Sequence, residues 1–287
     1  MKLLKSVILL ILILGIFGGG GYIAWMMLYK PVQPTETERA AAKAPAPPTP
    51  PPDPAAPQLA KVQALRKEKK SAEARELLEA IVTNYPTAPS AEEARNLLGE
   101  YNADLALSTQ PMPDKVEYVI KSGDSLDKIA RQFKTSSELV MRSNNLANTI
   151  IQPGQRLLIF QPDFSLELQL GAKKVVLLHK GKFFKQYAVR ASVLPGGVGR
   201  ATESKTKVAE KAAWRDGKRV TFGSKEYPGS ARWIVFAQAG YTLYPEAAAG
   251  AGSAAAAKPP TGLGLDPADL EELHTLVSPG INVSIVP

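Results

Sequence analysis

The stretch Glu117-Tyr-Val-Ile-Lys-Ser-Gly-Asp-Ser-Leu126 decides the fold of the best-defined part of this chain. Its first residues alternate between polar and apolar, which indicates a strand, and its Gly-Asp-Ser turn leads into a helix that Ser125 is placed to cap. A capping box at Thr135–Glu138 indicates a second helix. The stretch Ile150-Ile-Gln-Pro-Gly-Gln-Arg-Leu-Leu-Ile159 indicates a turn and a final strand. The sequence thus predicts a β-α-α-β unit over residues 116–160.

This unit resembles a LysM domain, because the Gly-Asp-Ser-Leu, Ala-x-x-Phe, Asn-Asn-Leu and Pro-Gly-Gln elements all occur in register. LysM domains bind the N-acetylglucosamine chains of peptidoglycan or chitin. The resemblance implies a groove between the first strand–helix loop and the second helix–strand loop. The glycan-binding residues that it implies are Gly123, Asp124, Ser125, Leu126, Asn148, Ile150, Ile151, Pro153 and Gly154.

The chemistry of these loops suits a sugar ligand. Backbone amides and carbonyls in tight glycine loops can form hydrogen bonds with N-acetyl groups, while Leu126, Ile150 and Ile151 can contact sugar faces. An alternative stays open, in which the glycines and Pro153 only shape turns and Leu126 belongs to the core. The two roles are compatible for a single residue.

Residues 164–287 form several short alternating segments and end in one helix and a last strand. The expected strands are Val175–Leu178, Phe183–Val189, Trp233–Ala237 and Asn282–Val286, and the expected helix is Pro267–Val277. In this order and spacing, and with the element Tyr227-Pro-Gly-Ser-Ala-Arg-Trp-Ile234, the segments resemble the L,D-transpeptidase domain of bacterial cell-wall enzymes. The resemblance implies a mainly β, sandwich-like fold with a catalytic cleft beside the helix.

The catalytic residues of that family are missing here. The family has a nucleophilic Cys, an activating His and an Arg between the Trp element and the helix, and this chain has no cysteine. Alignment back from the helix places Gly262 at the position of the Cys, Gly264 at that of the Arg and Tyr244 at that of the His. The resemblance therefore implies a pseudoenzyme without catalytic residues, whose scaffold is retained.

The remaining side chains lead to the same expectation. A thiolate attacks an amide well, whereas Ser or Thr needs a base within hydrogen-bond reach. The two histidines, His179 and His274, do not occupy the position of the family's His, and we expect them on the surface or on a helix flank. An alternative stays open, in which the chain is a divergent L,D-transpeptidase that cross-links peptidoglycan with an unusual nucleophile such as Ser253 or Thr261.

The N-terminus predicts the compartment. Ser6–Tyr29 is an uncharged run of 24 residues behind the basic start Met1–Lys5, and at 1.5 Å per residue it would span roughly 36 Å, enough to cross a bilayer. Positive charges on the N-terminal side favour a cytoplasmic N-terminus. We therefore expect residues 1–30 to be a single-pass signal-anchor in the cytoplasmic membrane, with the bulk of the chain in the periplasm or otherwise outside the membrane. A cleaved signal peptide with its apolar region in Val7–Phe17 is the alternative.

Two further segments connect the membrane to the folded part. Residues 31–57 contain ten prolines and seven alanines, a composition that favours an extended polyproline spacer. Residues 58–107 have apolar residues at steps of three and four, which predicts a helical hairpin resembling a tetratricopeptide-like repeat. A single hairpin cannot bury its apolar face alone, so we expect it to pack on a neighbouring module or on a protein partner such as a wall enzyme.

Composition limits the function classes. The net charge of +8 lies mainly in the two C-terminal modules, where residues 115–160 carry seven basic and four acidic side chains and residues 161–287 carry sixteen and eleven. A basic surface suits anionic wall polymers. No recognition helix, stacked aromatic signature or zinc-ligand spacing points to nucleic acid, and no metal or cofactor is expected. The absence of cysteine excludes disulfides and a lipidated N-terminal Cys. The sequence as a whole predicts a multidomain α+β protein.

Overall fold

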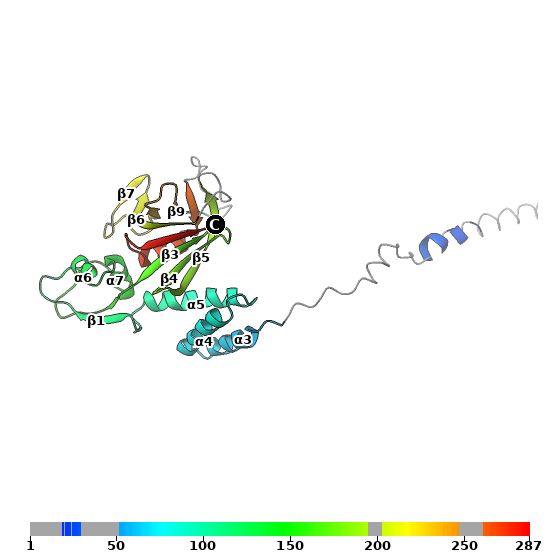
Figure 1. Cartoon of the computed structure of the whole chain (residues 1–287), viewed down its shortest axis with the longest axis horizontal. Coiled ribbons are helices and arrows are strands. Elements are labelled where there is room, and N and C mark those ends of the chain that lie inside the picture. Colours follow the sequence, from blue (N-terminus) through cyan, green and yellow to red (C-terminus); the bar gives the residue numbers. More distant parts are fainter. Residues whose placement is uncertain (1–18, 20, 24, 30–51, 195–202, 247–260) are drawn as a thin grey trace, which may run out of the picture. The chain divides into compact units, whose positions relative to one another are not determined.

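The computed structural model describes residues 19, 21–23, 25–29, 52–194, 203–246 and 261–287 (Figure 1). The chain divides into two compact units, Met1–Pro52 and Asp53–Pro287. In the first unit, residues 19, 21–23 and 25–29 are helical, and most of the predicted anchor and linker lies outside the described residues. Among the residues that the structure describes, no helix is long and apolar enough to cross a membrane.

The second unit begins with three helices, and not with the two of the predicted hairpin. They are α3 (Ala56–Lys67), α4 (Ser71–Asn84) and α5 (Ala91–Ala106). The first predicted helix is broken at Lys69, which adopts a positive φ of 59°, while the amide of Lys70 donates to the carbonyl of Leu65. Capping of this kind ends a helix, and it converts one long apolar series into two helices that pack against each other.

Helix α5 packs on the C-terminal domain, which confirms the expectation that the helices need a neighbouring module. Its partner is strand β5 (Lys182–Val193), where a register shift against β4 (Lys174–His179) leaves Phe184 out of the sheet ladder. The buried Asn102 fills that gap, because its side-chain amide donates to the Phe184 carbonyl over 2.9 Å. Gly99 permits the close approach, since a Cβ there would lie 2.8 Å from Cγ of Lys185.

The predicted β-α-α-β unit is present. It consists of β1 (Lys115–Val119), α6 (Leu126–Gln132), α7 (Ser137–Ser143) and β2 (Arg156–Phe160), and the two strands pair antiparallel. The predicted cap at Ser125 forms, because its hydroxyl accepts from the Lys128 amide. The predicted capping box at Thr135–Glu138 does not, because the N-cap of α7 is Ser136, whose hydroxyl accepts from the Leu139 amide. A small core of Ile120, Leu126, Ile129, Ala130, Val140, Leu157 and Ile159 holds the unit together.

The C-terminal domain is a single closed sheet, and not a sandwich of two separate layers. The new strands are β3 (Phe164–Gln169), β4 (Lys174–His179), β6 (Ser204–Arg215), β7 (Lys218–Val220), β8 (Ala231–Phe236), β9 (Thr242–Pro245), β10 (Gly262–Leu265) and β11 (Asn282–Val286). Their order is β11-β3-β4-β5-β10-β9-β8-β6-β7, and β11 also pairs with β6. This last pairing closes the sheet. The four strands and the one helix that the sequence predicted for this domain are all present.

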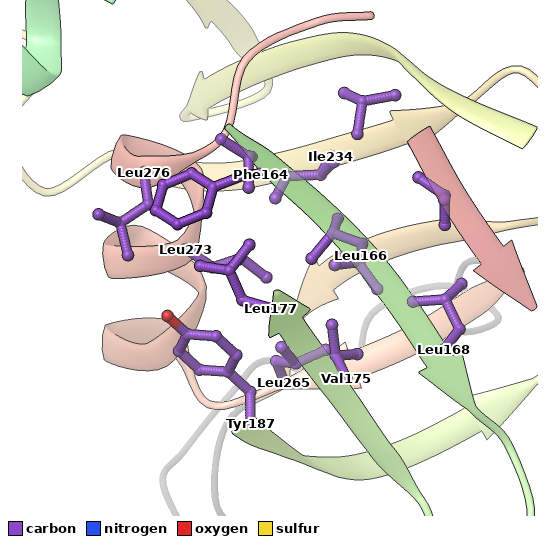
Figure 2. Close-up of a cluster of buried hydrophobic side chains, with 14 of the residues drawn as sticks. Phe164, Leu166, Leu168, Val175, Leu177, Tyr187, Ile234, Leu265, Leu273 and Leu276 are labelled. Carbon is purple, nitrogen blue, oxygen red and sulfur yellow. The ribbon is translucent and has the colours of Figure 1, made fainter. Parts of the chain in front are cut away.

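The core of this domain lies between the sheet and helix α8 (Pro267–Leu276) (Figure 2). Leu273 and Leu276 of the helix face Phe164, Leu166 and Leu177 of the first two strands. The Tyr187 ring is buried in the same cluster, and its hydroxyl donates to the Glu272 carboxylate over 2.9 Å. Apolar residues therefore alternate inward along the strands and fix the position of α8.

The Asn102 hydrogen bond should contribute measurably to stability. Replacing Asn102 with Ala leaves the buried Phe184 carbonyl without this donor, and we expect the free energy of unfolding to fall by about 1–3 kcal/mol. Asn96 of the same helix is exposed and bonds Gln186, so Asn96→Ala is the matched control, with a change within about 0.5 kcal/mol. Chemical denaturation measures both variants, and equal losses would contradict the assignment.

Candidate functional site

The two predicted groove loops meet at one end of the β1–β2 pair. The first loop follows β1 and the second precedes β2, and antiparallel pairing brings them together. Backbone hydrogen bonds link them directly, from the Ile120 amide to the Gln155 carbonyl over 2.9 Å and from the Gly154 amide to the Ile120 carbonyl over 2.8 Å. The geometry of one loop therefore fixes that of the other.

The first loop is held by its own polar residues. The Asp124 carboxylate accepts from the Lys121 amide and from the Tyr118 hydroxyl, both over 2.8 Å. These two bonds lower the pKa of Asp124, because they stabilise its charged form. The ammonium group of Lys128 donates to the Gly123 carbonyl over 2.8 Å, and Gly123 itself needs its positive φ of 82°. Asp124 and Ser125 thus act first as turn and cap residues of the loop.

The second loop is more open. The Asn148 side-chain oxygen accepts from the Ile150 amide over 2.9 Å, and Gly154 adopts a φ of 86°. Pro153 and Gly154 are exposed, and Ile150 is 76% exposed, which is unusual for a large apolar side chain. Ile150 is therefore the strongest candidate for an apolar contact with a sugar face.

Two of the predicted contact residues are placed differently. Leu126 is only 3% exposed and lies in the small core, so the expectation that it contacts a sugar face is wrong. Its first position in α6 explains this, because the capped helix turns that side chain inward. Ile151 is only partly buried: one part of its side chain packs against the same core, and the rest stays accessible in the second loop.

The three positions that the resemblance aligns with catalytic residues, Tyr244, Gly262 and Gly264, come together. Strands β9 and β10 run parallel, and Tyr244 lies opposite Gly264. Gly262 has a φ of 145°, and a Cβ on it would lie 2.0 Å from the carbonyl oxygen of Thr242. A Cβ on Gly264 would lie 3.0 Å from Cε2 of the Tyr244 ring. The backbone of β10 is therefore specific for glycine at position 262, and it cannot hold a nucleophilic side chain there without moving.

Tyr244 is not a base. Its side chain is buried at 2% exposure, and its ring lies 5.9 Å from that of Trp233. Its hydroxyl has no hydrogen-bond partner among the described residues, and burial raises its pKa above the usual value for tyrosine. Thr261 is exposed just before β10, with no hydrogen bond from its hydroxyl to a titratable group in the described ranges. Ser253 and the predicted cleft segment 247–258 lie outside the described residues.

Both histidines are more buried than predicted. His179 packs among Phe160, Phe164 and Phe184, because the strand end that carries it turns onto the core. His274 is 3% exposed, and its Nδ1 lies 3.4 Å from the Glu138 carboxylate on α7. The expectation of surface or helix-flank histidines is therefore wrong, although neither of them lies in a groove loop or on β9 or β10.

Sequence reasoning missed the charged junction that joins α7 to the C-terminal domain. Glu138 is 6% exposed, and its carboxylate lies 3.8 Å from the Lys211 ammonium and 3.4 Å from His274. Burial by itself would raise the pKa of Glu138, but His274 and Lys211 outweigh it and hold the pKa at about 2. Burial lowers the pKa of Lys211 to about 8. Only the folded chain brings these distant residues together. Within the described ranges, no group of His, Cys, Asp or Glu could hold a metal ion.

Comparison with known proteins identifies one domain. A family model for the LysM domain matches residues 118–160, which confirms the predicted LysM domain. No curated protein sequence matches the chain. The chain contains no cysteine, which fits the prediction of a C-terminal domain that lacks the catalytic residues.

Several solved structures with some similarity are L,D-transpeptidases. One from Stackebrandtia nassauensis is 18% identical, with a TM-score of 0.30 over 43% of this chain and 55% of that chain. One from Mycobacterium smegmatis is 10% identical, with a TM-score of 0.30 over 47% and 64%. L,D-transpeptidase 1 from Mycobacterium tuberculosis is 9% identical, with a TM-score of 0.29 over 47% and 68%. The chain thus spans about half to two thirds of these proteins.

The strain at position 262 gives a stability prediction. A side chain at Gly262 meets the Thr242 carbonyl and an unfavourable φ, so Gly262→Cys should lower the free energy of unfolding by about 3 kcal/mol or more. The adjacent Thr261 is exposed, and Thr261→Cys is the control that adds the same thiol at a cost within about 0.5 kcal/mol. Thermal unfolding measures both variants. A Gly262→Cys protein as stable as the control would show that the strand adapts to a nucleophile.

Proposed function

We propose that this protein is a non-enzymatic component of the bacterial cell envelope that binds the N-acetylglucosamine chains of peptidoglycan through its LysM domain. The observation that carries the proposal is the LysM match over residues 118–160, together with two loops that meet through backbone hydrogen bonds at one end of that domain. The exposed Ile150 beside these loops offers an apolar contact, and the net positive charge of the domain suits an anionic polymer.

The C-terminal domain, in this proposal, has a structural or binding role in place of transpeptidase catalysis. Transpeptidation needs a nucleophile, a base and donors for the oxyanion. The chain has no cysteine, Gly262 is confined by the Thr242 carbonyl, and Tyr244 is a buried phenol with a raised pKa. The domain is nevertheless well packed at this strand, because Leu263 and Leu265 of β10 lie in its hydrophobic core.

The N-terminal segments, in this proposal, hold the binding domain at a distance from the membrane. The uncharged run Ser6–Tyr29 is long enough to be an anchor, and the proline-rich residues 31–57 would reach roughly 80 Å at ~3.1 Å per residue. The bulk of the chain would then lie outside the cytoplasmic membrane. A wall enzyme bound through the helices α3 and α4 stays a prediction.

Binding to peptidoglycan is the direct test. We expect the full chain to sediment with insoluble peptidoglycan, and N-acetylglucosamine oligomers to release it. Ile150→Glu should weaken retention by about tenfold or more, since it places a charge where an apolar sugar face would lie. Sedimentation assays with increasing oligomer measure this effect.

The control separates sugar recognition from charge. Gln132→Glu adds the same negative charge on the exposed end of α6, outside both loops, and should bind like the wild type. If wall polymer and an unrelated anionic polymer retain the protein equally, or if both variants lose binding equally, simple charge attraction explains the result and the proposal fails.

Enzyme assays distinguish the proposal from a divergent transpeptidase. We expect no cross-linking of tetrapeptide stems and no exchange of their terminal D-amino acid above a heat-inactivated control, because the chain has no cysteine and Gly262 and Tyr244 supply neither a nucleophile nor a good base. Mass spectrometry of the products measures both reactions. Turnover that disappears in Ser253→Ala or Thr261→Ala would establish the enzyme instead.

Fractionation tests the anchor. An apolar span behind Lys2 and Lys5 should keep the protein in the membrane fraction after a high-salt wash, and residues 53–287 should be accessible to protease added from outside the cytoplasm. Quantitative blotting follows the chain, and sequencing gives its mature N-terminus. A mature chain that begins near Ala24 would mean a cleaved signal peptide.

A further inference from the structure

A hollow lies at the junction between the LysM helices and the C-terminal domain. Asp127, Ser136 and Ser137 line it from the LysM domain, and Lys211 and His274 line it from the C-terminal domain. Its volume is about 320 Å³, which is near the lower end of the range for ligand sites, roughly 300–1,000 Å³. Ligand sites occur preferentially at interfaces between domains.

The two walls of this hollow are held in place, because the two domains share one core. Leu139 of α7 and Phe160 of β2 belong to the same hydrophobic cluster as the strands of the C-terminal domain. The Arg142 side chain donates to the Thr275 hydroxyl over 3.0 Å, which joins α7 to α8. The hollow is therefore preformed, and a ligand can bind without a movement of one domain against the other.

His274 leaves one polar atom of the hollow without a partner. The residue is 3% exposed, and its Nδ1 lies 3.4 Å from the Glu138 carboxylate. Burial lowers the pKa of His274, so the imidazole is neutral at pH 7 and has one N–H group and one acceptor nitrogen. The carboxylate favours the proton on Nδ1, which makes Nε2 the acceptor. Nε2 has no hydrogen-bond partner among the described residues, and a buried acceptor is stabilised by a ligand that donates to it.

The charges that line the hollow are balanced. Its two acidic side chains are Asp127 and Glu138, and its two basic side chains are Lys211 and Arg219. Each base already has an acidic partner, since Lys211 lies 3.8 Å from Glu138 and Arg219 forms an ion pair with Glu210. A carboxylate or an ammonium group in the hollow would meet a like charge, and its opposite charges would already be paired. The hollow therefore favours a neutral ligand.

The uncharged side chains of the hollow suit a sugar residue. Thr221 and Tyr227 supply hydroxyl groups, and Val220 and Phe222 supply apolar surface. A pyranose ring is neutral, its hydroxyl and N-acetyl groups donate hydrogen bonds, and its C–H faces are apolar. A stem peptide carries free carboxylates, which the two acidic side chains would repel. The chemistry of the hollow thus favours a sugar over a stem peptide.

The same glycan strand that reaches the LysM groove can reach this hollow. Asp127 directly follows the first groove loop. A Cβ on Gly223, in the loop after β7, would lie 3.7 Å from Cγ2 of Thr149 in the second groove loop. Thr221 and Phe222, which precede Gly223, line the hollow. The hollow is therefore a neighbour of both groove loops.

We propose that this hollow is a second sugar-binding site, in which Nε2 of His274 accepts a hydrogen bond from a hydroxyl or N-acetyl group of the sugar. The inference rests on the proposed binding of the LysM domain to N-acetylglucosamine chains. It gives the C-terminal domain a part in glycan recognition, because His274, Lys211 and Thr221 belong to that domain. This part does not involve β9 or β10, which carry the positions aligned with catalytic residues.

The two histidines of the chain allow a direct test. In full-length protein with isotopically labelled histidine nitrogens, titration with the N-acetylglucosamine hexamer should shift the imidazole signals of His274 in NMR spectra, because its acceptor nitrogen gains a donor. The signals of His179, which packs among phenylalanine rings, should not shift.

Matched substitutions measure the contribution to affinity. His274→Phe keeps a buried ring and removes the acceptor, so calorimetric titration should show hexamer binding weakened about fivefold, the loss expected for one hydrogen bond. His179→Phe is the matched control and should bind the hexamer like the wild type. Thermal unfolding checks that both variants fold.

A variant at the rim leaves the buried histidine intact. Thr221 is exposed and lines the hollow, so Thr221→Trp should fill the hollow without disturbing the core. In this variant the His274 signals should no longer respond to the hexamer. This result does not depend on whether His274→Phe folds.

Each outcome has a distinct meaning. Absence of hexamer binding to the wild type overturns the proposed function of the LysM domain, and this inference with it. Hexamer binding that leaves the His274 signals unchanged, or a His274 response that persists in Thr221→Trp, overturns this inference and leaves the LysM function intact. A His274 response to a free tetrapeptide stem, and not to the hexamer, assigns the hollow to a peptide and overturns the inference as well.

Discussion

The pairing of the last strand with two others is the constraint on which the folded unit depends. Strand β11 runs parallel to β3 and antiparallel to β6, and these are the two contacts that close the sheet. Val283 and Ile285 of β11 point into the core that holds helix α8. Since α8 also carries Thr275, whose hydroxyl accepts from Arg142 of the LysM domain over 3.0 Å, closure of the sheet fixes the surface on which that domain rests.

The charged junction adds specificity to this contact. Glu138, Lys211 and His274 are buried together, and removing one member of such a group typically costs 3–5 kcal/mol because it leaves a charge without its partner. Attraction to Lys211 and His274 favours the charged carboxylate, as its low pKa indicates. The LysM domain therefore has one preferred orientation on the sheet.

Local signals predicted the LysM domain well because its structure is local. Ser125 and Ser136 cap the helices that their neighbours predict, and the loops follow from Gly123 and Gly154. Signals that depend on distant partners failed. The start of α5 shows this, since the Ser90 side chain makes no capping hydrogen bond and the Ser90 amide donates to the distant Asp53 carboxylate over 2.8 Å.

The same distinction between local and distant signals explains which strands of the C-terminal domain could be predicted from the sequence. Strands β8 and β11 alternate clearly and β4 is a continuous apolar run, whereas β6 is rich in lysine and alanine and β9 and β10 are only four residues long. These three strands are stabilised because each pairs with a strand on both sides. Their partners are distant in the sequence, so a short stretch of sequence does not reveal them. Sequence alignment nevertheless placed Tyr244 and Gly264 at related positions, and the structure puts them opposite each other.

The two faces of β10 have different requirements. Leu263 and Leu265 face the core and hold the strand between β9 and β5, so they cannot change without loss of packing. Gly262 and Gly264 have no such role in the core. The Tyr244 ring packs closely against the strand beside Gly264, and a side chain at position 264 would obstruct this contact. A strand held by inward leucines is thus compatible with an outer face of glycines that leaves no room for a side chain at position 262.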